Sequence, residues 1–126
     1  MEKTIINTAD APAPIGPYNQ AVFAGNMLFI SGQICIDPVS GQLKKKDLQE
    51  ETHQVMANLK AILQAAGMTF NNVVKTTIFL TDMKRFSELN EIYGKYFESD
   101  FPTRETVQVS ALPKFVNVEI SMIAAR

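Results

Sequence analysis

The amino-acid sequence predicts an α+β fold in which a mixed six-stranded sheet carries two helices on one face. Two stretches with apolar residues at three- and four-residue steps predict helices, and the runs around them are rich in β-branched and aromatic residues. The elements follow the order β-β-β-α-β-α-β-β, and helices separated by strands favour a sheet with one helical layer. The chain of 126 residues contains no repeat or Ser/Gly linker, so residues 1–126 are expected to form a single domain.

The first quarter of the chain predicts a rigid loop followed by a hairpin. Residues 9–17 are rich in proline, which lacks the amide hydrogen that a helix or central strand needs, so we expect an ordered loop leading into Tyr18. Two extended runs, 19–24 and 27–31, flank Gly25-Asn26, a dipeptide typical of a two-residue hairpin turn.

The remainder of the chain predicts two helices and three strands. Residues 47–66 have an apolar stripe of helical spacing, with Asp47 suited to the N-cap and Gly67 to the left-handed stop. The further predicted elements are a strand at 73–80, a helix from Asp82 to about Phe97, and strands at 105–109 and 117–124.

Charge and composition exclude several classes of function. Twelve Lys+Arg against 13 Asp+Glu give a formal net charge of −1, which disfavours nucleic-acid or anionic-membrane binding driven by bulk charge. One cysteine excludes an intramolecular disulfide framework, and with one histidine it leaves few soft metal ligands. No run approaches the roughly 18 apolar residues of a membrane span, and the start lacks the apolar stretch of a secretory signal. We therefore expect a cytoplasmic protein.

Strand alternation predicts which side chains share a face of the sheet. In the last strand, Val118, Ile120, Met122 and Ala124 point one way, opposite Asn117, Glu119, Ser121 and Ile123. In the preceding strand, Val107, Val109 and Ala111 oppose Arg104, Thr106, Gln108 and Ser110. If the apolar sets meet the helices, Arg104 and Glu119 lie in the same layer on the other face. That mixed face predicts packing against another subunit, with a wet pocket at the seam.

Two charged side chains are the candidates for chemistry. Arg104 follows Pro102 at the start of a strand, and it is either one partner of a surface salt bridge or a fork that binds a carboxylate through two parallel hydrogen bonds. Glu119 lies on an otherwise apolar strand, where an unpaired carboxylate is costly and so needs a partner or a function. His53 reads as a surface residue of the first helix and Cys35 as a small buried thiol.

Several short motifs, in order along nearly the whole chain, make it resemble one family. The resemblance is to the Rid (YjgF/YER-type) family, and most closely to its RidA branch of enamine/imine deaminases. The motifs are Ala13-Pro14-Ile15-Gly16-Pro17-Tyr18, Gly25-Asn26, Ser31-Gly32-Gln33, Asn58-Leu59-Lys60-Ala61-Ile62, Ala65-Ala66-Gly67, Val74-Lys75-Thr76-Thr77, Pro102-Thr103-Arg104 and Leu112-Pro113 with Val118-Glu119-Ile120.

The resemblance implies a fold, an assembly and a set of site residues. It implies a chorismate-mutase-like fold and a homotrimer with an inner barrel of sheets, whose sites lie in the clefts between subunits. The family's carboxylate-binding arginine falls on Arg104 and its water-orienting glutamate on Glu119. Substrate contacts fall on Tyr18, Ser31, Asn90 and Thr106, the last standing where many relatives carry cysteine. Glu105 departs from the small or apolar residue usual after the arginine, so pairing of Arg104 with Glu105 is an open alternative.

The implied activity is a hydrolytic deamination without metal or organic cofactor. The substrates would be 2-aminoacrylate and 2-aminocrotonate, released by pyridoxal-phosphate enzymes, and the products 2-oxoacids and ammonia. One alternative is a non-catalytic regulator that binds a small 2-oxoacid or amino acid. A second alternative is an RNA-directed translation inhibitor or ribonuclease, which the charge balance and single histidine disfavour.

Overall fold

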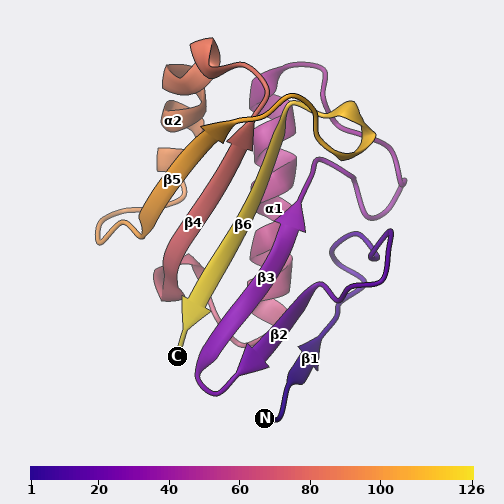
Figure 1. The fold of residues 1–126 in the computed structure, drawn as a ribbon, viewed down its shortest axis with the longest axis vertical. Helices are drawn as coiled ribbons and strands as arrows, with labels where there is room; N and C mark the ends of the chain where they lie inside the picture. Colours follow the sequence, from indigo (N-terminus) through magenta and orange to yellow (C-terminus); the bar gives the residue numbers. More distant parts are fainter.

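The computed structural model describes residues 1–126 and confirms the predicted α+β fold (Figure 1). One six-stranded sheet has the order β1-β2-β3-β6-β4-β5, in which only β4 and β5 run parallel. Both helices lie on the same face of this sheet (Figure 1). The strands are β1 (Thr4–Ile6), β2 (Ala21–Ala24), β3 (Met27–Gln33), β4 (Val73–Leu80), β5 (Thr103–Gln108) and β6 (Val118–Ala125).

The long helix α1 (Leu48–Ala65) forms as its sequence predicts. The side chain of Asp47 caps the first turn by accepting the backbone N–H of Glu50 at 2.7 Å. At the other end, Gly67 adopts a positive φ of 74°, a conformation that a side chain would strain. The apolar stripe of α1 packs on the centre of the sheet, and no helix of the chain is both long and apolar enough to cross a membrane.

The second helix is shorter than the predicted span from Asp82 to Phe97. Asp82 does act as a cap, but for a 3₁₀ turn, Met83–Arg85, through the N–H of Lys84 at 3.0 Å. The α-helix α2 (Phe86–Gly94) begins only after Arg85, whose backbone angles are not helical. Asp100, with a positive φ of 52°, then turns the chain into β5. Periodicity alone did not distinguish the 3₁₀ turn from the first turn of an α-helix.

The core lies between the helices and the central strand β6. Its side chains Val118, Ile120, Met122 and Ala124 are all buried beneath α1, which confirms the predicted apolar set of the last strand. Glu119, Ser121 and Ile123 lie on the other face, as alternation predicts.

The face assigned to Arg104 was wrong. In the parallel pair, Arg104 lies beside Thr76, which is fully buried and accepts a hydrogen bond from Tyr93 of α2 at 2.9 Å. Arg104 therefore points to the helical side, whereas Val107 lies on the open side and is 44% exposed. The error has a physical cause, because β5 is an edge strand and neither of its faces is buried deeply enough to make the apolar set diagnostic. Arg104 and Glu119 thus lie on opposite faces of the sheet.

No element of the chain covers the open face of the sheet (Figure 1). Two apolar pairs lie on it, Phe29 beside Ile123 and Phe79 beside Val107, and Phe29 is 43% exposed. Polar residues such as Thr77 and Ser121 lie between the two pairs, which agrees with the mixed character predicted for this face. Exposed apolar side chains on an uncovered sheet face are typical of a contact surface.

Asn58 fixes the segment that follows β3. It is 1% exposed, and its Nδ2 donates to the carbonyls of Ile34 at 3.1 Å and Ile36 at 2.9 Å. We expect Asn58→Leu to lower the free energy of unfolding by about 1–3 kcal/mol, because the Ile36 carbonyl is left without a donor. Thermal or urea denaturation measures the change. The exposed neighbour Ala57→Leu should stay within about 0.5 kcal/mol of wild type; equal stabilities of the two variants would contradict the assignment.

Candidate functional site

The side chain of Arg104 lines a hollow between β5 and α2. This arginine hollow is lined by Asn90, Tyr93, Gly94, Phe101, Pro102 and Arg104. The guanidinium carbon lies 5.2 Å from the ring centroid of Tyr93 and 5.5 Å from that of Phe86, both on α2. Cation–π contact with these two rings positions the guanidinium while leaving its N–H groups unused.

Arg104 has no ion pair or hydrogen bond within the chain, and Glu105 does not neutralise it. Alternation sends Glu105 to the open face, where its carboxylate pairs with Lys75 at 3.1 Å and accepts the hydroxyl of Thr77 at 3.2 Å. The hydrogen bond from Lys75 holds the pKa of Glu105 below its ordinary value. The alternative of a pair between Arg104 and Glu105 is therefore excluded, and the guanidinium is free to bind an anion.

Two further polar atoms near Arg104 are buried without a hydrogen-bond partner. They are Oδ1 of Asn90, which lines the arginine hollow, and Oγ1 of Thr106, two residues beyond Arg104 on the same side of β5. Buried polar atoms are nearly always paired, so an unpaired acceptor beside a free cation indicates a missing ligand. The hollow offers the N–H donors of Arg104 for a carboxylate and the amide oxygen of Asn90 as an acceptor for an N–H group.

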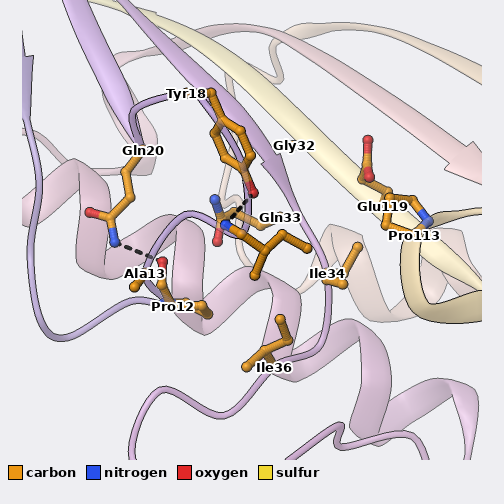
Figure 2. Close-up of a pocket in the computed structure, with 11 residues that line it drawn as sticks. Pro12, Ala13, Tyr18, Gln20, Gly32, Gln33, Ile34, Ile36, Pro113 and Glu119 are labelled. Atoms are coloured by element: carbon orange, nitrogen blue, oxygen red, sulfur yellow. Dashed lines mark hydrogen bonds between the residues drawn. The ribbon is translucent and has the colours of Figure 1, made fainter. Parts of the chain in front are cut away.

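Glu119 lies in a second pocket on the other side of the sheet (Figure 2). Tyr18 enters this glutamate pocket from the proline-rich loop, and the side chains of Ile15, Ile34 and Ile36 give it an apolar wall. The complete lining is Pro12, Ala13, Ile15, Tyr18, Gln20, Gly32, Gln33, Ile34, Ile36, Pro113 and Glu119.

The carboxylate of Glu119 has no hydrogen bond or ion pair within the chain. It lies directly against Gly32, where an added Cβ would come within 2.5 Å of Oε2. Partial burial without a compensating charge raises the pKa of Glu119 above its ordinary value. Glycine at position 32 thus makes the space in which this carboxylate sits, and a raised pKa suits a group that takes and returns a proton near neutral pH.

Tyr18 lines the glutamate pocket, whereas Ser31 lies outside it. The Tyr18 hydroxyl accepts the backbone N–H of Ile15 at 3.2 Å, so the ring lies against the proline-rich loop at the pocket (Figure 2). Ser31 does not line the glutamate pocket; its hydroxyl donates to the carbonyl of Asn19 at 2.6 Å. Ser31 therefore holds the residue next to Tyr18.

Sequence reasoning missed the buried side chain that folds the proline-rich loop. Gln20 is 2% exposed, and its Nε2 donates to the carbonyls of Thr8, Ala11 and Pro12 at 3.0, 3.3 and 2.9 Å. The sequence does contain a signal for this role. Gln20 follows soon after a loop that has no regular secondary structure, and the buried carbonyls of such a loop need side-chain donors.

The remaining residues of reactive type lie outside both pockets. Cys35 is buried, as predicted, and burial raises its pKa to about 11. His53 contacts the hydroxyl of Tyr96 and belongs to an aromatic cluster between the helices. No cluster of three or more His, Cys, Asp and Glu side chains that could hold a metal ion is present.

Comparisons with known proteins agree on one family. The family model described as Endoribonuclease L-PSP matches residues 8–126. The chain is 50% identical to the 2-iminobutanoate/2-iminopropanoate deaminase of Bos taurus, over 100% of this chain and 92% of the relative. Among solved structures, YyfA of Yersinia pestis, described as of the Rid protein family, has a TM-score of 0.96 at 47% identity, covering 99% and 100% of the two chains. Escherichia coli TdcF with bound serine has a TM-score of 0.93 at 43% identity, covering 98% of each.

Removing the charge of Glu119 should stabilise the protein at neutral pH. Because the pKa of Glu119 is raised in the folded state, binding of its proton stabilises the fold. This contribution to the free energy of unfolding is fully present below the unfolded-state pKa of about 4.3 and is lost as pH rises through the folded-state pKa. Glu119→Gln should therefore melt higher than wild type at pH 7–8, and the gain should vanish near pH 4.

Glu105→Gln is the matched control with the opposite sign. Its pKa is lowered, so its contribution is present above the unfolded pKa and lost as pH falls through the folded pKa. This variant should melt lower than wild type at pH 7–8. Melting curves of the three proteins across pH 4–8 test both signs; a Glu119→Gln that is less stable at neutral pH contradicts the burial of an unpaired carboxylate.

Proposed function

Because the chain belongs to the Rid family, which the endoribonuclease L-PSP model describes, we propose that it hydrolyses 2-imino acids and their enamine tautomers to 2-oxoacids and ammonia. The substrates are 2-aminoacrylate and 2-aminocrotonate, which pyridoxal-phosphate enzymes release into the cytoplasm. Relatives named 2-iminobutanoate/2-iminopropanoate deaminase, about 50% identical over nearly the whole chain, support this activity.

The unpaired guanidinium of Arg104 is the observation that carries the proposal. A small 2-imino acid has a planar carboxylate, and a guanidinium positioned by two rings can bind such a group through two parallel hydrogen bonds. The unpaired Oδ1 of Asn90 and Oγ1 of Thr106 are acceptors for the N–H of the imine or enamine. Binding at the carboxylate then fixes the position of the adjacent C=N carbon.

Glu119 is the group that moves the proton. Glu119 takes a proton from a water molecule as the water oxygen adds to the imine carbon, and it passes that proton to the imine nitrogen, which gives a carbinolamine. Glu119 then takes the proton of the carbinolamine hydroxyl and delivers it to the nitrogen as the C–N bond breaks, so ammonia leaves and the carbon retains the oxygen as a ketone. General acid–base catalysis of this kind contributes about 10²–10⁴-fold. The raised pKa of Glu119 suits both steps.

The active site forms between two copies of the chain. Arg104 and Glu119 lie on opposite faces of one sheet, so a substrate held by Arg104 of one copy meets Glu119 and Tyr18 of a neighbour. The apolar pairs on the open face, Phe29 with Ile123 and Phe79 with Val107, supply part of the contact surface. We propose a homotrimer with three such sites, the closed ring that one heterologous contact generates.

A regulator that only binds a small acid is the second candidate function. The solved structure of Escherichia coli TdcF contains serine, which favours recognition of an amino or oxo acid by a relative of this fold. The description of the family model as an endoribonuclease raises RNA as a substrate. A net charge of −1 and a histidine outside both pockets favour a small acid instead.

The test couples the protein to a threonine dehydratase that releases 2-aminocrotonate, and it follows semicarbazide trapping of the imine. Wild type should speed 2-oxobutanoate formation and reduce trapping. Arg104→Ala should lower kcat/KM by about 10²–10⁴-fold, since it removes two charge-assisted hydrogen bonds. Arg104→Lys keeps the charge but not the fork, and should recover only part of the loss.

Arg85→Ala is the matched control, because Arg85 is a surface arginine of the same region that pairs with Glu88 at 3.3 Å. It should keep wild-type rates. If wild type does not reduce trapping of the imine but binds 2-oxobutanoate saturably, the deaminase activity is rejected and the role of a binding regulator is established.

A further inference from the structure

A buried carboxylate outside both pockets holds the chain just before Glu119. Glu51 of α1 is 0% exposed. Its Oε2 accepts the backbone N–H of Asn117 at 2.7 Å and of Val118 at 3.0 Å, and its Oε1 accepts Nδ2 of Asn117 at 2.8 Å. The three donors come from two adjacent residues, so one carboxylate clamps one point of the backbone.

The backbone donors of Asn117 and Val118 need Glu51 because β3, one of the two neighbours of β6, does not pair with the first residues of β6. The ladder between β3 and β6 reaches Ile120 and has no pair at Val118 or Glu119, and it contains a bulge between Ile30 and Gln33. On the other side, the carbonyl of Asn117 accepts the N–H of Thr81 at 3.0 Å. Glu51 thus supplies the missing half of the support at the start of β6.

The position of the Glu119 carboxylate depends on that support. Glu119 follows Val118 directly, and its own carboxylate makes no hydrogen bond that could hold it in the space beside Gly32. Its place is therefore set by the backbone at residues 117–119. We propose that Glu51 is a positioning residue for the reaction, which holds Glu119 at the reacting carbon without touching substrate. This inference rests on the proposed function, in which Glu119 moves the proton.

The test separates turnover from substrate binding. Glu51→Leu removes all three acceptor contacts and should lower kcat by about 10–100-fold, because small misplacements of a catalytic group have effects of this size. KM should stay within about twofold of wild type, since Arg104 still holds the carboxylate of the substrate. A Glu119 that leaves its buried position also loses the cause of its raised pKa, so the acid limb of the kcat–pH profile should move to lower pH.

Glu51→Gln should rescue activity. Its amide oxygen can accept both backbone N–H groups, and its NH₂ can donate to Asn117 once that side-chain amide turns over. Leu63→Ala is the control for loss of stability alone, because it opens a cavity at the far end of α1. It should melt lower than wild type and keep wild-type kcat and pH profile. If Glu51→Leu does not fold, Glu51→Asp takes its place, because it keeps the charge and draws the carboxylate back by one methylene.

The outcomes distinguish this inference from the function on which it rests. A wild-type protein that does not reduce imine trapping rejects the deaminase itself. The inference is overturned if wild type is active but the kcat and pH profile of the Glu51 variant are no more altered than those of Leu63→Ala. Glu51 then has a structural role only. A selective loss of kcat with a shifted acid limb, restored by Glu51→Gln, supports it.

Discussion

Strand pairing around β4 separates the two side chains, Arg104 and Glu119, that we propose to act on the substrate. Arg104 lies beside Thr76 in the parallel pair with β5, and Glu119 lies beside Phe79 in the antiparallel pair with β6. Thr76 and Phe79 are three residues apart, so alternation sends them, and the partners beside them, to opposite faces. No change of rotamer reverses this, because moving either side chain to the other face needs a one-residue slip of a whole strand. The proposal that the site is shared between copies of the chain follows from that separation.

Each half of the site is built to be rigid and incomplete. On the helical side, two rings of α2 orient a guanidinium that has no partner in its own chain. On the open side, a carboxylate sits against Gly32, also without a partner. Leaving these groups unpaired in a folded chain costs stability, and natural proteins keep such costs where function needs them.

The sequence predicted the elements better than their faces. Helix α1 and strand β4 were predictable because a long amphipathic stripe and a run of β-branched residues are strong local signals. The side on which Arg104 lies was not, since β5 has one neighbour and its register follows from contacts distant in sequence. The residue pattern singled out Arg104 and Glu119, the family resemblance added Tyr18 and Asn90, and all four line the two pockets. Glu51 could not be predicted, because only the fold reveals that its partners are the backbone amides of Asn117 and Val118.

A mixing experiment tests most directly whether the site is shared between copies. Arg104→Ala and Glu119→Gln subunits, each inactive alone, are co-expressed with different tags, and assemblies that carry both tags are purified. If the site is shared, a trimer that carries both tags restores about one site in three, from Arg104 of one subunit and Glu119 of the next. Mixed assemblies of wild-type size with no more imine hydrolysis than the separate variants would contradict the account.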